Sequence, residues 1–288
     1  MALSLRAVLP KTSPLATLQA LPVCASPHCP RPASLWQRWW ARREGIWLEE
    51  HWYCSSSCFH AGLYRRLEQA AMAVPPAAAA RNRLPLGLIL LSQGDITAEQ
   101  LHRALAQQAQ AGTGRLGEWL RQMGAVGEPQ ITAALAVQQA CAVFSAREPR
   151  WVPPRLRWPE SLARRYRALA VFHNSVQQLL YVGFLDQVDR SFLYTLEQML
   201  HCQTRPCIVS NVTYCRQRDL YANDGDVPCI DINQRQSSIE MMRTIGNYAD
   251  QVHAERCSIV RCADRLWIRL EPPQGVQLDL VFRAPTLS

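Results

Sequence analysis

Hydrophobic positions recur with helical spacing in two tandem segments of the same design. Each segment reads Leu-Gly-x-x-Leu, then ten residues, then Leu/Ile-x-x-x-Leu-x-x-Gln, and the second begins 30 residues after the first, at Leu116 instead of Leu86. A repeat at a fixed offset indicates a duplicated supersecondary unit. We expect a short helix, a turn and a longer helix in each copy. In the first copy, Thr97 and Gln100 form a capping-box pattern at the start of the longer helix.

Shorter apolar runs alternate with helical patterns after the repeat. Their spacing predicts three helices and three strands, at 161–169, 191–200 and 212–221 and at 170–173, 179–184 and 206–210. After a turn-rich stretch at 221–226, it predicts a helix at 237–255 and strands at 257–260, 265–270 and 278–282. Helices and strands in this order indicate a multidomain α+β protein.

Composition divides the chain into segments of different character. We expect a disordered leader at 1–22, a small zinc-binding module at 23–70, an Ala/Pro linker at 71–82, a helical tandem-repeat domain at 83–146, a small α+β subdomain at 155–221, and a C-terminal helix plus hairpin at 227–288. The fold class is therefore α+β, with the zinc module first and the repeat domain second.

Four of the eleven cysteines form two close pairs, Cys24-x4-Cys29 and Cys54-x3-Cys58. Each pair can supply two thiolates from one turn, and two such pairs satisfy the tetrahedral coordination of Zn²⁺. We therefore predict one structural zinc on these cysteines. Three nearby histidines are alternative ligands for a Cys₃His site: His28, His51 and His60.

Five tryptophans lie between the two cysteine pairs, interleaved with arginines: Trp36, Trp39, Trp40, Trp47 and Trp52. These rings can form the core of the small module. They can also stack on nucleobases while the arginines contact phosphates. The second interpretation makes a zinc-containing, nucleic-acid-binding regulatory protein the alternative function.

The chain carries a net charge of +8, and Lys11 is its only lysine, so its positive charge comes from arginine. Arginine pairs bidentately with phosphates and carboxylates, so this composition suits anionic ligands, with solvated surface charge as the alternative. No phosphate loop or hydrolase motif is present, and Asp186 and Asp189 are interpreted as loop-capping carboxylates. We expect no membrane span, because no apolar run approaches about 18 residues. We also expect the protein to be non-enzymatic and cytoplasmic.

The tandem motif resembles the N-terminal domain of the type II secretion and type IV pilus assembly ATPases. In some members each half of this motif binds one half of cyclic di-GMP, and the binding version begins Arg-Leu-Gly. That start is intact at 115–117, whereas the first copy reads Pro-Leu-Gly at 85–87, with Arg83 two residues before the proline. Residues 161–221 resemble the second N-terminal subdomain of the family, and the ATPase core is missing from this sequence.

The resemblance implies an adaptor or sensor that binds cyclic di-GMP or docks on a protein of a secretion or pilus system. It implies these ligand-binding residues: Arg83, Leu86, Gly87, Leu90, Gln108, Arg115, Leu116, Gly117, Leu120 and Gln138. Arg115 and helix-start amides would contact phosphate, and the leucines would contact bases and sugars. Alternatively, the leucines and glycines build only the core of the motif.

Overall fold

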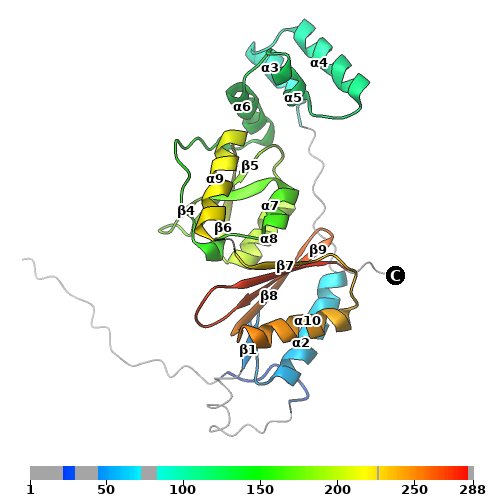
Figure 1. Cartoon of the computed structure of the whole chain (residues 1–288), viewed down its shortest axis with the longest axis vertical. Helices are drawn as coiled ribbons and strands as arrows, with labels where there is room; N and C mark the ends of the chain where they lie inside the picture. The colour runs from blue at the N-terminus through cyan, green and yellow to red at the C-terminus, as the bar shows by residue number, and fades with distance from the viewer. Residues whose placement is uncertain (1–21, 30–44, 73–82, 226, 285–288) are drawn as a thin grey trace, which may run out of the picture.

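The computed structural model describes residues 22–29, 45–72, 83–225 and 227–284. The expected leader and the expected Ala/Pro linker therefore lie almost entirely outside the described residues. Figure 1 shows the helices of the repeat at one end of the molecule, a sheet with helices in the middle, and a second sheet with two helices at the other end. No helix within these ranges is long and apolar enough to cross a membrane.

The tandem repeat forms four helices in the described chain: α3 (Leu86–Gln93), α4 (Ala98–Ala111), α5 (Leu116–Gln122) and α6 (Glu128–Gln139). Each copy is a short helix, a turn and a longer helix, as the repeat predicts. The capping box is present, because Gln100 N donates to Thr97 Oγ1 at 3.2 Å and Thr97 N donates to Gln100 Oε1 at 2.8 Å. Gly94 ends α3 in the left-handed conformation, with φ 78°, which glycine adopts without strain.

Equivalent positions of the two copies form the core of the repeat. Leu90 and Leu120 are both 0% exposed, and so are Ala104 and Ala134 beside them. α3 packs against α6 and α4 packs against α5, so the first helix of each copy contacts the second helix of the other. The two copies therefore share one small core that a single copy could not form.

Four strands of the described chain form the middle sheet, in the order β3 (Ala142–Val143), β6 (Gln203–Ile208), β5 (Leu179–Phe184) and β4 (Ala168–Asn174). β4 and β5 are antiparallel, whereas β6 is parallel to both of its neighbours. Helices α7 (Glu160–Tyr166), α8 (Arg190–Leu200) and α9 (Asn211–Asp224) pack on this sheet, and α6 contacts β3 and β6. β5 has the predicted bounds. α7 ends three residues before the predicted end, because Arg167 leaves the helix in a left-handed conformation.

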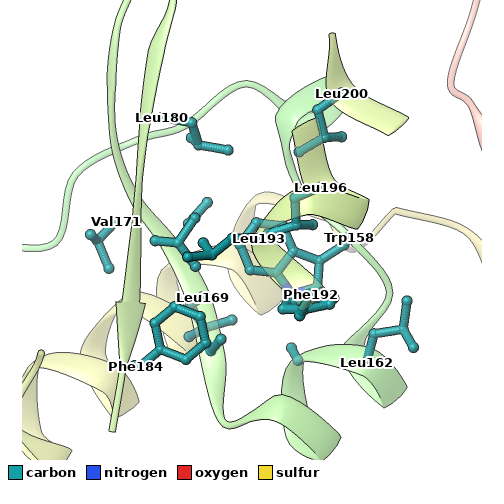
Figure 2. Packing of buried hydrophobic residues seen from close by; sticks show 14 of the residues in the cluster. Trp158, Leu162, Leu169, Val171, Leu180, Phe184, Phe192, Leu193, Leu196 and Leu200 are labelled. Carbon is teal, nitrogen blue, oxygen red and sulfur yellow. The ribbon is translucent and has the colours of Figure 1, made fainter. Parts of the chain in front are cut away.

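Aromatic side chains pack among leucines in the core of this middle body (Figure 2). Trp158 and Phe192 meet edge to face with ring centroids 5.7 Å apart, and Tyr166 stacks on Phe192 at 3.9 Å. Phe184, at the end of β5, is fully buried in the same cluster. This packing fixes the end of β5, and the loop that follows β5 lies against the repeat helices.

Six strands of the described chain form the second sheet, in the order β2 (His51–Tyr53), β1 (Ile46–Leu48), β8 (Arg256–Cys262), β9 (Arg265–Glu271), β10 (Leu278–Arg283) and β7 (Cys229–Ile232). The sequence assigns residues 23–70 and 227–288 to separate segments, but β1 pairs in parallel with β8. The two segments join in one sheet because a hairpin of two three-residue strands buries too little surface to be stable alone.

Both faces of the second sheet are covered. On one face, α2 (Ser56–Met72) and α10 (Ser238–Gln251) pack over alternate residues such as Leu266 and Ile268. On the other face, Trp267 is fully buried in the core of the middle body. The buried ion pair of Arg269 with Asp279, at 2.8 Å, lies on this face, and Arg269 also donates to the carbonyls of residues 155 and 157 at 2.7 and 2.6 Å. The two sheets are therefore packed together through a shared core and a satisfied polar network.

Candidate functional site

The structure brings the four paired cysteines together. The sulfur atoms of Cys24, Cys29, Cys54 and Cys58 all lie within 4.8 Å of one another. Cys54 follows β2 and Cys58 lies in the first turn of α2, whereas the other two cysteines lie on the loop at 24–29. That loop is joined to the hairpin by a hydrogen bond from Ala25 N to the carbonyl of residue 52 at 2.9 Å. The cluster could hold a zinc ion, because four sulfur donors in this arrangement match its preferred coordination.

The histidines that were alternative ligands lie outside this group. Among the described residues, the group that could hold a metal ion consists of the four cysteines alone. His28 and His51 are exposed. The ring of His60 packs against Gly246 of α10, where a methyl group on the glycine would lie 2.1 Å from His60 Nε2. His60 therefore serves the contact between α2 and α10.

The thiols of the cluster are close enough to shift one another's titration. Burial and hydrogen bonds with Cys29 and Cys24 raise the pKa of Cys54 to about 12. Burial also raises the pKa of Cys24, whereas at Cys58 burial is outweighed by hydrogen bonds, which lower the pKa. Sulfur atoms of Cys29 and Cys54 lie 3.4 Å apart, so protonated thiols are forced to share hydrogen bonds. A divalent cation would replace these contacts by stabilising the thiolates directly.

Of the five tryptophans near the cluster, two lie in the described residues. Trp47, on β1, is partly buried and packs against the core. Trp52 is buried, and its indole lies against Gly45, where an added methyl group would be 2.4 Å from Trp52 Nε1. This ring is part of the core and cannot stack on a nucleobase. Trp36, Trp39 and Trp40 lie outside the described residues.

A cavity of about 710 Å³ lies between the repeat helices and the middle body. Seven of the ten ligand-binding residues implied by the resemblance line it: Arg83, Leu86, Gln108, Arg115, Leu116, Gly117 and Gln138. The opposite wall comes from the middle body, with Arg167, Asp186 and Asn211 among its residues. The repeat therefore contributes one wall of the cavity rather than a complete site.

The other three implied ligand residues do not line the cavity. Leu90 and Leu120 are 0% exposed and pack in the core of the repeat. Gly87 does not line the cavity, and a methyl group there would lie 2.6 Å from Leu101 Cδ1. This glycine is needed because the helices approach closely at that point.

The two motif glutamines each contact the opposite copy. Gln108 Nε2 donates to the carbonyl of Gly114 at 2.9 Å, and Gln138 Nε2 donates to the carbonyl of Leu84 at 2.8 Å. Both carbonyls lie two residues before a Leu-Gly start, so each glutamine positions the start of the other copy. This role follows from the exchanged packing of the helices, which the linear motif does not reveal.

Arg115 is paired across the cavity wall with Asp186, which follows β5. Arg115 Nη1 contacts Asp186 Oδ2, and Arg167 Nε lies 2.7 Å from the same oxygen. The contact with Asp186 raises the pKa of the Arg115 guanidinium. The backbone N–H of Arg115 donates to Glu118 Oε2 at 3.2 Å, so this predicted helix-start amide is already engaged.

The two aspartates interpreted as loop caps therefore differ. Asp189 caps α8, because Phe192 N donates to Asp189 Oδ1 at 2.9 Å, as predicted. Asp186 instead forms ion pairs with two arginines from different parts of the chain. The sequence does not predict this role of Asp186, because Arg115 lies 71 residues and Arg167 lies 19 residues before it in the chain.

Comparisons with known proteins give a likeness to solved structures alone. No protein-family model matches the chain, and no curated protein matches it. Among solved structures, the chain is similar to the structure of MshE with cdg, with a TM-score of 0.40 and 28% sequence identity. The matched region covers 48% of this chain and 99% of that one.

Proposed function

We propose that this chain is a non-enzymatic cytoplasmic adaptor or sensor that binds cyclic di-GMP in the cavity between the repeat and the middle body. One observation carries the proposal: seven of the ten residues that the motif implies line a single cavity of about 710 Å³. That volume lies within the range of roughly 300–1,000 Å³ that is usual for small-ligand pockets.

The lining of the cavity matches the chemistry of a cyclic dinucleotide. Such a ligand carries two phosphates and two flat bases, so it needs cationic donors together with apolar surface. Four arginines line the cavity: Arg83, Arg115, Arg121 and Arg167. Leu86, Leu116 and Leu135 supply apolar surface on the repeat side. Arginines provide charge-assisted hydrogen bonds to phosphate oxygens, and the apolar side chains provide contacts for the bases and sugars.

The proposal includes a structural role for one zinc ion on the four cysteines. The loop at 24–29 and the start of α2 would both be attached to this ion, because each supplies ligands. The ion would then stabilise the β1–β2 hairpin at the edge of the second sheet, where β1 pairs with β8. The zinc site is therefore proposed to support the fold rather than a reaction.

The absence of a phosphate-loop motif is the basis for proposing that the chain does not hydrolyse ATP. A phosphate loop needs a lysine near the terminal phosphates, and Lys11 is not part of such a motif. Magnesium-dependent ATP turnover that persists through stringent purification would contradict this part of the proposal.

Isothermal titration calorimetry of the full chain with cyclic di-GMP tests the proposed ligand. We expect saturable binding of cyclic di-GMP, with GMP and cyclic di-AMP as controls that bind at least about tenfold more weakly. Absence of binding to cyclic di-GMP would overturn the nucleotide proposal. The repeat would then be better interpreted as a docking scaffold for a protein of a secretion or pilus system.

A further inference from the structure

An arginine outside the tandem repeat lies beside the same acidic oxygen as Arg115. Asp186 Oδ2 is buried from solvent, and it is in contact with Arg115 Nη1 and 2.7 Å from Arg167 Nε. All three residues line the cavity of the proposed ligand site. Two guanidinium groups thus converge on one anionic oxygen, which is the arrangement that proteins use to bind a phosphate oxygen.

The backbone fixes the position of Arg167 relative to Asp186. Arg167 ends α7 with φ 49° and ψ 44°, a left-handed conformation that residues other than glycine rarely adopt. Its carbonyl accepts a hydrogen bond from Leu185 N at 3.1 Å, immediately before Asp186. The arginine and the aspartate are therefore joined through adjacent backbone, whereas Arg115 approaches from the repeat.

We propose that Arg167 provides a second phosphate contact in this cavity, in place of the motif arginine that the first repeat lacks at residue 85, and that Asp186 occupies the phosphate position until the ligand displaces it. The inference rests on the proposed function and extends it to two residues outside the motif. Pro85 stands where the first copy would need arginine, and it has neither a side-chain donor nor a backbone N–H. Arg167 supplies a guanidinium to the same cavity from the middle body.

The charges give Asp186 the role of an internal competitor. Its carboxylate shares one negative charge between the two arginines when no ligand is present, and a phosphate must take over both ion pairs. Asparagine has nearly the same shape but no negative charge, so Asp186→Asn should leave both arginines available to the phosphate. We expect this substitution to tighten binding of cyclic di-GMP by about three- to tenfold.

Calorimetry of the full chain with cyclic di-GMP tests the inference with a matched set of variants. Arg167→Ala should weaken binding by about tenfold or more, and Arg167→Lys should weaken it less because the positive charge remains. Arg164→Ala is the control, since Arg164 lies on the same helix, pairs with Glu160 and does not line the cavity. Thermal unfolding midpoints of all variants should stay within a few degrees of the wild-type value, which excludes misfolding as the cause.

The outcomes separate this inference from the proposed function. If the wild type binds while Arg167→Ala is silent or Asp186→Asn weakens binding, the roles given to these two residues are wrong and the proposed function stands. If only Asp186→Asn binds, the ligand does not displace the aspartate of the wild type, so the proposed function and this inference both fail. If neither the wild type nor Asp186→Asn binds, the proposed function and this inference both fail.

Discussion

The cysteine cluster and the repeat cavity are built on different plans. The cluster gathers four side chains of one type, all between residues 24 and 58, around a single point. The cavity gathers arginines, leucines and glutamines from a stretch that extends from Arg83 to Asn211. A local cluster of thiols can stabilise a small segment of chain by itself once a metal binds. A cavity between two folded units is formed where the two units meet. Substitutions of the residues that line it can therefore change ligand binding without changing the stability of either unit.

The contrast between residues that stabilise the fold and residues that line the cavity also occurs inside the repeat. Leu90 and Leu120 are fully buried in the core, whereas Leu86 and Leu116 are partly buried against that core and also line the cavity. Side chains from one short motif therefore divide between folding and the proposed ligand site. The following substitutions test that division and the contrast between the two regions.

The largest effect is expected from Cys54→Ser. Structural zinc sites contribute apparent free energies of about 10–16 kcal/mol in small domains, which is comparable with the whole stability of a domain. We expect metal content to fall from about one zinc per chain to near zero, and the β1–β2 hairpin to lose its protection from hydrogen exchange. Elemental analysis and hydrogen–deuterium exchange measure these two changes.

Cys215→Ser is the matched control for that experiment. Cys215 lies on α9, is partly exposed and is outside the cluster. This variant should retain the metal and the wild-type unfolding midpoint. A Cys54→Ser protein that contains no metal yet keeps full protection of the hairpin would show that the metal does not stabilise this segment.

A smaller but still large effect is expected from Leu120→Ala. Truncation of a fully buried leucine costs about 2–5 kcal/mol, because it removes apolar contacts and leaves a cavity. Leu88→Ala should cost less than about 0.5 kcal/mol, since Leu88 is 50% exposed. Urea unfolding followed by circular dichroism measures both. If Leu120→Ala loses ligand binding but keeps the wild-type stability, Leu120 contacts the ligand and is not required for the core.

Arg115→Ala should reduce ligand binding without unfolding the repeat. Loss of a charge-assisted hydrogen bond costs roughly 1.5–3 kcal/mol, which would weaken cyclic di-GMP binding by more than about tenfold. Arg103→Ala is the control, because Arg103 is exposed on α4, pairs with Glu99 and does not line the cavity. A tightly binding wild type with a silent Arg115→Ala variant would show that the transferred site is wrong.

The smallest effect is a gain from Pro85→Arg. Residue 85 has an extended conformation, with φ −56° and ψ 139°, that arginine also adopts, so the substitution should not strain the start of α3. It should tighten binding by up to roughly tenfold, or about 1.4 kcal/mol, because it restores the arginine of the binding motif. Leu84→Arg, at an exposed neighbouring position outside the cavity lining, adds the same charge and should change little.

Local signals in the sequence predict much of the fold. The capping box of Thr97 and Gln100, the four helices of the repeat and the bounds of β5 all follow from patterns within a few residues. Each cysteine pair also follows from its spacing, because ligands within one turn remain close in any fold. The meeting of the two pairs joins Cys29 to Cys54, 25 residues away, and it is predicted from the coordination chemistry of zinc rather than from a local pattern.

Contacts between distant segments are what the sequence does not predict. The pairing of β1 with β8 joins Trp47 to Arg256, and no property of either segment names the other. The ion pairs of Asp186 depend on how the middle body packs against the repeat. Likewise, the period of the motif places Leu90 and Leu86 on a helix but does not decide which of them faces the core.

A crystal structure of the full chain grown with cyclic di-GMP tests the central claim most directly. The account predicts one ligand in the cavity between the repeat and the middle body, with phosphate oxygens within hydrogen-bond distance of Arg115 and Arg167 and with Asp186 turned away from both. A ligand bound elsewhere on the molecule, or an empty cavity with the Arg115–Asp186 ion pair intact at saturating ligand, would contradict it.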